Sequence, residues 1–215
     1  MKKIFLVFLI FISASVVAVE KQPGEYEPKD FSHLIGMQGF SDSLLKMHFT
    51  LYHGYVKNTN LLIRLIEESQ GYTFGALQRR FGWEFDGMRL HEFYFENLGG
   101  KKPFDHSSAL NKMLDRDFGS FKKWKEDFIA TGLMRGIGWA ILYFDPKADR
   151  LFNVWINEHD LGHLAGGDLI LVMDVWEHAY ITEYGLDRAK YIENFFKNID
   201  WDAVSSRFHN AVIRR

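Results

Sequence analysis

The chain has 215 residues and a formal net charge of −2, with 47% hydrophobic residues, 16% aromatic residues and no cysteine. A chain of this length and composition can bury a large core, whereas disorder would require fewer aromatic side chains and a larger net charge. The balanced charge, without a lysine run or a glycine-rich phosphate loop, argues against nucleic acid as a partner. Without cysteine, any metal site must use nitrogen and oxygen ligands, which excludes iron–sulfur clusters and zinc–thiolate sites.

The N-terminus has the features of a secretory signal peptide. Met1–Lys3 is a short basic segment, Ile4–Ile12 is a continuous apolar run, and small residues begin at Ser13. The apolar run is shorter than the roughly 20 residues that a bilayer span requires, which favours cleavage after Ala18 over an uncleaved anchor. We therefore expect residues 1–18 to be removed and the protein to be exported, periplasmic or secreted, with no membrane attachment afterwards.

The first half of the mature chain predicts an arm and two helices. Ser41 is a plausible N-cap, and apolar residues recur after it at helical spacing. In chain order we expect an extended arm at residues 19–40, a helix at about 41–65, a break at 71–74, and a second helix at about 85–98 that ends at Gly99–Gly100. Residues 41–98 therefore predict a long helical hairpin.

The second half adds a sheet to further helices. We expect helices at residues 107–114, 118–131, 187–196 and 201–208, and strands at 136–144, 150–156 and 168–174. The expected fold class is α+β, an N-terminal helical hairpin followed by a C-terminal domain with a small three-stranded antiparallel sheet and helices. A border near residues 99–103 divides the mature chain into an arm and α-hairpin domain, 19–100, and a C-terminal α/β domain, 101–215.

The segment from Asp174 to His178 offers a carboxylate and an imidazole four residues apart. Both can converge on one metal ion, and Trp176 between them supplies an apolar wall. This spacing alone is common, and most such pairs are structural or exposed. Two further histidines, His48 on the apolar face of the first helix and His91 on the second, would complete a set of three neutral nitrogens and one carboxylate.

Residues 174–180, Asp-Val-Trp-Glu-His-Ala-Tyr, resemble the signature of the iron/manganese superoxide dismutase family. Further segments resemble that family in the same order along the chain, at residues 55–60, 91–98, 118–121, 136–139, 191–196 and 200–201. The similarity covers roughly residues 40–210, nearly the whole expected mature chain. Because the matches are independent and collinear, chance is a poor explanation for them.

The resemblance implies an enzyme that converts superoxide to dioxygen and hydrogen peroxide by cycling one metal ion per subunit between M(III) and M(II). The implied metal ligands, with a solvent molecule in a fifth position, are His48, His91, Asp174 and His178. This ligand set accepts iron or manganese. The implied assembly is a homodimer or a dimer of dimers.

The same resemblance gives roles to residues around the metal. Those expected to guard or line the substrate channel are Tyr55, Trp139 and Trp176. Glu177 would reach across a dimer interface to the His178 of the partner, and so give each of these ligands a carboxylate partner. Arg188 would lie near the channel mouth, where its charge could attract a small anion.

The glutamine with which the family bonds the metal-bound solvent is absent from both of its usual places. The first place, four residues before His91, holds Gly87, and the second holds His159. We therefore predict that His159 bonds the solvent, against the alternative of a surface histidine in a loop, and His163 could replace it or add to the network. A histidine at position 159 makes the chain similar to some iron-using or metal-flexible members of the family, which favours iron over manganese.

The spacing from His48 to Tyr55 is seven residues, whereas the family typically has eight. Without a π-bulge, His48, Tyr52 and Tyr55 fall on one helix face, so His48 is preferred as the ligand over His53. Tyr52 takes the place of a channel histidine, and Ile181 takes that of the tyrosine that bonds this histidine across the dimer. Both ends of one hydrogen bond have changed, so we expect altered proton delivery, with Tyr52 among the catalytic residues.

Two alternatives to a dismutase remain open from the sequence. One is a non-catalytic metal-binding homologue of the same fold, although the presence of all four ligands argues against a decayed site. The other is a different metalloenzyme, such as a hydrolase, on the same ligands. No His-Glu-x-x-His motif occurs in the chain, and the aromatic lining suits a small substrate.

Overall fold

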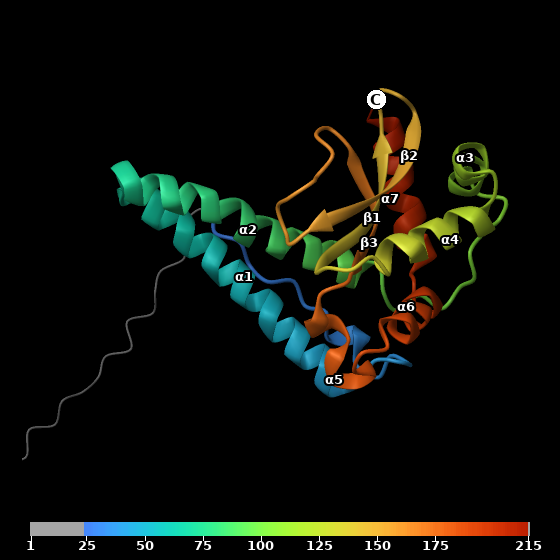
Figure 1. The fold of residues 1–215 in the computed structure, drawn as a ribbon, viewed down its shortest axis with the longest axis horizontal. Helices are drawn as coiled ribbons and strands as arrows, with labels where there is room; N and C mark the ends of the chain where they lie inside the picture. Colours follow the sequence, from blue (N-terminus) through green and yellow to red (C-terminus); the bar gives the residue numbers. More distant parts are fainter. Residues whose placement is uncertain (1–23, 215) are drawn as a thin grey trace, which may run out of the picture.

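A computed structural model describes residues 24–214; the expected signal peptide, residues 1–18, lies outside them. Figure 1 shows a pair of long helices that extends to one side and a three-stranded sheet surrounded by shorter helices. This confirms the predicted α+β fold class. Within residues 24–214, no helix is long and apolar enough to cross a membrane.

The elements follow the predicted order, and each predicted strand agrees with the observed one to within two residues at either end. The first part contains a 3-10 helix, η1 (Ser32–Leu34), and the helices α1 (Asp42–Glu68) and α2 (Gly71–Glu96). The second part contains α3 (Ala109–Phe118), α4 (Phe121–Gly132), β1 (Gly138–Asp145), β2 (Arg150–Asn157), β3 (Asp168–Asp174), η2 (Glu177–Ala179), α5 (Ile181–Tyr184), α6 (Arg188–Lys197) and α7 (Trp201–Ile213).

Helix α1 begins where the sequence predicts. The side chain of Ser41 accepts a hydrogen bond from the backbone N–H of Leu44 at 3.3 Å and so caps the helix. The helix is regular throughout its 27 residues, without a π-bulge. The seven-residue spacing from His48 to Tyr55 is therefore accommodated in ordinary α-helix, with His48 and Tyr52 on the buried face.

The predicted break at residues 71–74 and the predicted helix start at Phe85 were wrong. Only Ser69 and Gln70 separate the two long helices, and α2 begins at Gly71. Gly71 has a φ of 58°, a left-handed conformation that glycine adopts without strain, and this permits the short connection. Packing against α1 along the hairpin then keeps the following residues helical despite their weak intrinsic propensity (Figure 1).

The helix predicted from Phe118 begins three residues later, at Phe121. Gly119, at a φ of 87°, ends α3 in the left-handed conformation, and its N–H donates to the carbonyl of Asp115. The Ser120 side chain then caps α4 by accepting from the N–H of Lys123 at 3.1 Å. Two adjacent cap signals thus separate α3 from α4.

The sheet has the strand order β2-β1-β3, with both pairs antiparallel. The central strand β1 is almost entirely buried. Its second residue, Trp139, is paired with Ile156 on one side and with Asp174 on the other. The register of the sheet therefore places the Trp139 indole beside the carboxylate at the end of β3.

Glycine is required at the start of β1. A Cβ on Gly138 would overlap the carbonyl oxygen of Ile156, and the φ of Gly138 is 126°. A Cβ on Gly136 would lie 2.6 Å from the Trp155 ring. The Gly-x-Gly-Trp sequence therefore allows the strand to pass close to β2 and fixes where Trp139 enters the core.

The buried Asn97, directly after α2, joins the two parts of the molecule. Its side-chain amide donates to the carbonyl of Val172 on β3 at 2.5 Å, and its Oδ1 accepts from Arg207 on α7 at 2.7 Å. Its backbone carbonyl accepts from the N–H of Asp200 at 2.5 Å. These bonds hold the C-terminal end of α2 against the sheet, and so bring the α2 side chains to the end of β3.

Candidate metal centre

Four side chains from four segments meet where the helical hairpin joins the sheet. Their donor atoms all lie within 4.8 Å of one another, and they belong to His48 on α1, His91 on α2, Asp174 at the end of β3 and His178 on η2. The first three are buried, and the His178 side chain is 22% exposed. The structure therefore brings together all four residues that the sequence predicts as ligands.

The three imidazoles surround one carboxylate oxygen. The Nε2 atoms of His48, His91 and His178 lie 3.2, 3.8 and 3.1 Å from Asp174 Oδ2. Ligands bound at about 2.1 Å from a common ion and separated by angles of 90–120° lie about 3.0–3.6 Å apart. The His48 and His178 distances fall in this range and the His91 distance lies 0.2 Å beyond it, so the donors are close to the spacing that a single metal ion requires.

Two of these nitrogens lack a hydrogen-bond partner. The Nε2 atoms of His48 and His91 are buried, and neither forms a hydrogen bond with any described residue. A buried polar atom left in this condition costs about 1–3 kcal/mol, so native proteins rarely keep one without a reason. A metal ion would satisfy both nitrogens at once, which is the strongest sign that the residues present fit such an ion.

Neighbouring backbone groups orient the donors. The Nδ1 of His91 donates to the Gly87 carbonyl at 2.5 Å, which leaves the lone pair on Nε2 facing the other donors. The backbone N–H of Trp176 donates to Asp174 Oδ1 at 2.8 Å, so Oδ2 is the oxygen that faces the imidazoles. Both ligands are thus held in their binding orientation by the fold.

The protonation of the donors also suits a metal. Burial lowers the pKa of His48 and lowers that of His91 further, because a charged imidazole is costly in the core. Burial raises the pKa of the Asp174 carboxyl, but the His178 and His48 imidazoles outweigh it and hold that pKa far below its usual value. Buried neutral imidazoles and one carboxylate are the deprotonated forms that bind a cation.

The ring of His159 is buried beside this centre, and both of its nitrogens are hydrogen-bonded. The Trp139 indole N–H, which can only donate, lies 3.1 Å from Nδ1, so Nδ1 is the acceptor. Burial lowers the pKa of His159 to about 4, so the ring is neutral and its single proton is on Nε2. That N–H donates to the hydroxyl oxygen of Tyr55 at 2.7 Å.

The bond from His159 to a metal-bound solvent therefore stays a prediction. In the structure the Tyr55 hydroxyl already accepts the N–H that this bond would use. The alternative of a surface histidine in a loop is wrong, because His159 is fully buried. His163 does not replace it, since its ring bonds Tyr143 and the His159 carbonyl.

Tyr55 occupies the space that the side chain at position 87 would otherwise fill. A Cβ on Gly87 would lie 2.6 Å from the Tyr55 ring. That ring stacks on His91, with their centroids 5.1 Å apart. A glutamine at position 87 is therefore incompatible with Tyr55 in this position, which is a physical reason for the glycine.

Tryptophan rings form the walls around the donors. Trp139 lies edge-on to His91 with ring centroids 5.0 Å apart, and Trp176 stacks on His159 at 4.7 Å. Trp83, which the sequence interpretation missed, contacts both His159 and Trp176, at 5.0 and 5.9 Å. It lies eight residues before His91, two helical turns away on the same face, but the wrong start assigned to α2 left it outside the helix.

Tyr52 and Arg188 have their polar groups turned to other partners. The Tyr52 hydroxyl donates to Glu92 at 3.0 Å and accepts the backbone N–H of Lys29 in the arm at 2.9 Å. The Arg188 guanidinium donates to the carbonyls of Met134 and Gly136, both at 2.9 Å, and to the Tyr180 hydroxyl. Tyr52 thus anchors the arm, and Arg188 anchors the loop before β1.

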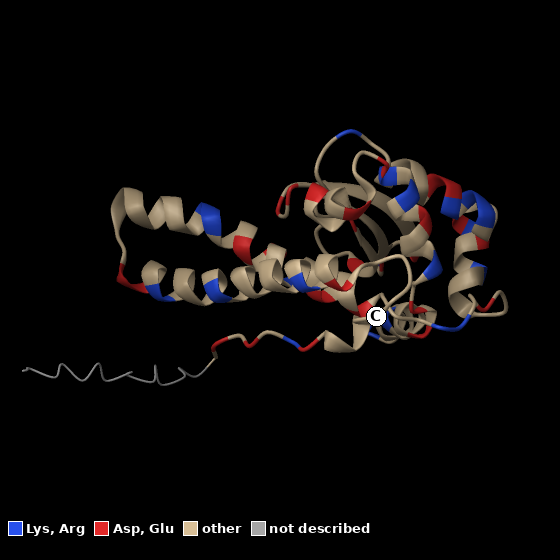
Figure 2. Ribbon diagram, turned by 90° about the horizontal axis from the view of Figure 1, so that it is seen from below, with Lys and Arg blue, Asp and Glu red and all other residues tan. Residues whose placement is uncertain are grey.

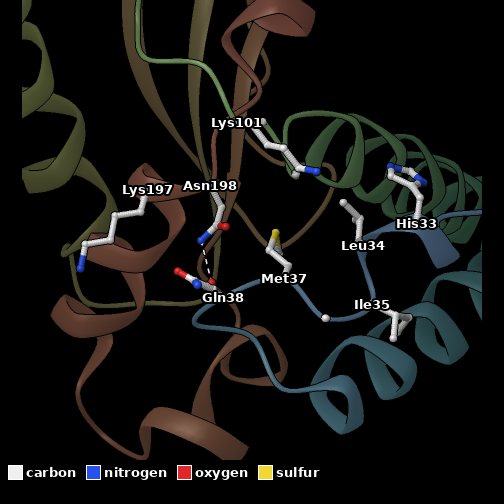
Figure 3. A pocket seen from close by; sticks show the side chains of 11 residues that line it. His33, Leu34, Ile35, Met37, Gln38, Lys101, Lys197 and Asn198 are labelled. Atoms are coloured by element: carbon white, nitrogen blue, oxygen red, sulfur yellow. Dashed lines mark hydrogen bonds between the residues drawn. The ribbon is translucent and has the colours of Figure 1, made fainter.

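Within residues 24–214, neither charge nor cavity size points to another site. Figure 2 shows basic and acidic residues interspersed along the helices, not gathered on one surface. A cavity of about 540 Å³ lies between the arm and the α6–α7 connection, away from the four donors. In Figure 3 the Lys197 side chain turns away from this cavity, and it pairs with Glu193 at 2.6 Å, while Asn198 bonds the Gln38 carbonyl.

Comparisons with known proteins agree with this arrangement. Residues 106–207 match the family described as iron/manganese superoxide dismutases, C-terminal domain. An iron superoxide dismutase of Cupriavidus metallidurans is 36% identical over 185 residues, 82% of this chain and 92% of that protein. A manganese superoxide dismutase of Haloferax volcanii is 32% identical, over 87% of this chain and 96% of the relative. An iron superoxide dismutase of Pyrobaculum aerophilum is 33% identical, over 80% of this chain and 85% of that protein.

Replacing Asp174 with asparagine tests the donor set. Asp174→Asn keeps the size of the side chain but removes the negative charge, so metal affinity should fall at least about 100-fold. Metal content, measured by elemental mass spectrometry, should fall from about one ion per chain to a small fraction. The matched control is Asp202→Asn, an exposed carboxylate 2.5 Å from Lys102, which should bind metal normally. Full metal content in Asp174→Asn would contradict the assignment.

Proposed function

The chain belongs to the iron/manganese superoxide dismutase family, and we propose that it converts superoxide to dioxygen and hydrogen peroxide at a single metal ion held by His48, His91, Asp174 and His178. The observation that carries this assignment of ligands is the convergence of three imidazole Nε2 atoms on one buried carboxylate oxygen. Two of those nitrogens are otherwise unpaired.

Bound iron or manganese would supply the redox step, by accepting one electron from a first superoxide and returning it to a second. The chain's own residues set the conditions for this exchange. Asp174 contributes one negative charge and the imidazoles contribute none, so a bound cation is only partly neutralised. The site therefore keeps an attraction for the superoxide anion in a chain whose net charge is −2.

Tyr55 is positioned to donate a proton, which the formation of peroxide requires. Because His159 donates to the Tyr55 oxygen, the tyrosine's own proton is not used in that bond and is available to a molecule at the donor set. Burial raises the pKa of Tyr55, and the nearby Asp174 carboxylate raises it further, so the hydroxyl stays protonated at neutral pH. Tyr55 thus holds a proton beside the site, and the bond from His159 leaves that proton available.

The walls restrict what reaches the donors. Trp139, Trp176 and Trp83 enclose His159, and the Tyr94 ring lies 5.3 Å from His48. Such an aromatic enclosure suits a substrate as small as a diatomic anion and limits the access of bulk water, which strengthens the electrostatic interactions inside. Its aromatic rings offer few hydrogen-bonding groups for a larger substrate, which favours the dismutase over a hydrolase.

Iron is the metal we favour. The same donors can also bind manganese, so a protein that works with either metal is compatible with this site. The relatives include both iron and manganese enzymes, so the family itself does not decide between the two metals. The support for iron is the imidazole of His159, which takes the place of an amide. An imidazole has one proton to donate where an amide has two, so the hydrogen bonding that tunes a redox centre is different here.

Reloading the protein with each metal tests the function. The full chain should consume superoxide catalytically when loaded with iron, and with manganese at an equal or lower rate, whereas the zinc-loaded protein should be inactive because zinc has no accessible redox change. The rate is measured by following superoxide decay after pulse radiolysis. Stoichiometric iron or manganese without any catalysis would instead support the non-catalytic, metal-binding homologue.

A homodimer, or a dimer of such dimers, is the assembly we favour, with Glu177 reaching the His178 of the partner. Glu177 is exposed and forms no ion pair within residues 24–214, although it is adjacent in sequence to a metal-site histidine. Exposed apolar side chains lie close by in the chain, at Ile181 and Leu186. A carboxylate that pairs with His178 across an interface would fix the orientation of that ligand.

Sedimentation analysis tests this assembly. The wild-type protein should sediment at twice the chain mass or more, and Glu177→Ala should shift the equilibrium towards monomer and lower the metal content. Glu126→Ala, which alters an exposed residue of α4, is the control and should leave both unchanged. A monomeric wild-type protein with a full metal site would contradict the role of Glu177.

Export is the localisation we favour, with the signal peptide at residues 1–18 cleaved. The support is the basic, apolar and small-residue pattern at the N-terminus. Mass spectrometry of the protein isolated from cell fractions should find a chain that begins at Val19, outside the cytoplasm. Recovery of the intact N-terminus in the cytoplasm would refute export.

A further inference from the structure

Backbone hydrogen bonds close the base of the loop that carries His159, and His159 lies at the tip of that loop, beyond these bonds. Asn157 and Leu161 exchange two backbone hydrogen bonds, at 3.0 and 3.3 Å, across the base of the loop. Between them Glu158 has a φ of 56°, a left-handed conformation that a non-glycine residue adopts only when its surroundings enforce it. Something beyond the base of the loop must therefore hold the tip.

His163 holds the tip. Its Nε2 lies 2.8 Å from the carbonyl oxygen of His159, and its Nδ1 lies 2.6 Å from the Tyr143 hydroxyl. A carbonyl can only accept, so Nε2 carries the proton and donates to it, and Nδ1 accepts from Tyr143. Tyr143 is a buried residue of the central strand β1. The backbone of His159 is thus bonded, through His163, to the buried central strand of the sheet.

We propose that His163 is a positioning residue for the reaction: it fixes the backbone of His159, so that the His159 ring delivers its one N–H to Tyr55. The proposal rests on the proposed function, because Tyr55 matters only if superoxide reacts at this site. His163 contacts no donor of the metal centre and needs none to act. It works through a carbonyl, not through the His159 ring, so it does not pass protons to that ring.

The surroundings of His163 fit this role. The Asp86 carboxylate on α2 lies 3.7 Å from its Nε2, too far for a hydrogen bond but close enough to favour an N–H at that atom. Tyr143, by donating to Nδ1, specifies the same tautomer from the other side. Two independent neighbours therefore select the form of His163 that can donate to the His159 carbonyl.

Two amide variants separate the positioning bond from the rest of the side chain. In His163→Gln the amide nitrogen reaches the position of Nε2 and can still donate to the carbonyl. In His163→Asn the amide reaches only the position of Nδ1, so the bond to Tyr143 can persist while the bond to His159 is lost. The two variants differ by one methylene and are otherwise matched. His209→Ala, on the exposed face of α7, is the control for loss of a histidine.

The first readout is ¹⁵N NMR of histidine-labelled full-length protein, which reports the His159 ring directly, with or without metal. The wild type and His163→Gln should show a slowly exchanging N–H on Nε2 of His159, and His163→Asn should lose it. The second readout is superoxide turnover of the iron-loaded proteins. It should fall about tenfold in His163→Asn and less than about twofold in His163→Gln and His209→Ala.

Tyr143→Phe serves if His163→Asn does not fold. It removes only the hydroxyl that specifies the tautomer and should reproduce both effects at reduced size. Wild-type behaviour of His163→Asn in both readouts, or of Tyr143→Phe if the former is unfolded, would overturn the proposal. If the wild type itself has no turnover, the proposed function fails. The positioning proposal then loses its reaction, while the NMR comparison still decides whether His163 orders His159.

Discussion

The charge of a completely buried carboxylate must be balanced by hydrogen bonds or by opposite charge. The groups that meet this need at Asp174 come from both parts of the molecule and determine how those parts are arranged. Three imidazoles from three other segments face one of its oxygens, and a backbone N–H satisfies the other. His178 follows Asp174 closely in the chain, whereas His48 and His91 reach it because the hairpin docks against the sheet, where Asn97 bonds β3 and α7. The fold therefore depends on the same group that, with a bound cation, forms the centre. This is why metal binding and folding should be coupled in this protein.

Around that centre, the chemistry of the side chains determines which atom donates and which accepts in each hydrogen bond from Trp139 to His159 to Tyr55. The Trp139 indole can only donate, so the His159 ring must accept at one nitrogen and donate at the other, to Tyr55. Glycines make the geometry possible: Gly138 allows β1 to pass close to β2, and Gly87 leaves room for the Tyr55 ring. Each of these glycines is explained by a specific close approach.

The sequence predicted the α+β class and the three strands because these depend on local periodicity. It predicted the four donor residues because collinear segments resemble one family, whereas the Asp174–His178 spacing alone has common structural explanations. It failed at the start of α2, where packing against α1 overrides the weak helix propensity of Gly71–Phe74. That error hid Trp83, which lies two residues before the predicted start of the helix and contacts His159 in the structure. Partners such as those of Tyr52, in the arm, and Arg188, in the loop before β1, are set by contacts distant in sequence. No local pattern encodes them.

The central claim is that one redox-active ion binds to His48, His91, Asp174 and His178. The most direct measurement is anomalous diffraction from crystals of the iron-loaded protein, recorded on both sides of the iron absorption edge. The account predicts one anomalous peak per chain, about 2.0–2.2 Å from the three Nε2 atoms and from Asp174 Oδ2. A peak elsewhere, or one that lies more than about 3 Å from any of these four atoms, would contradict it.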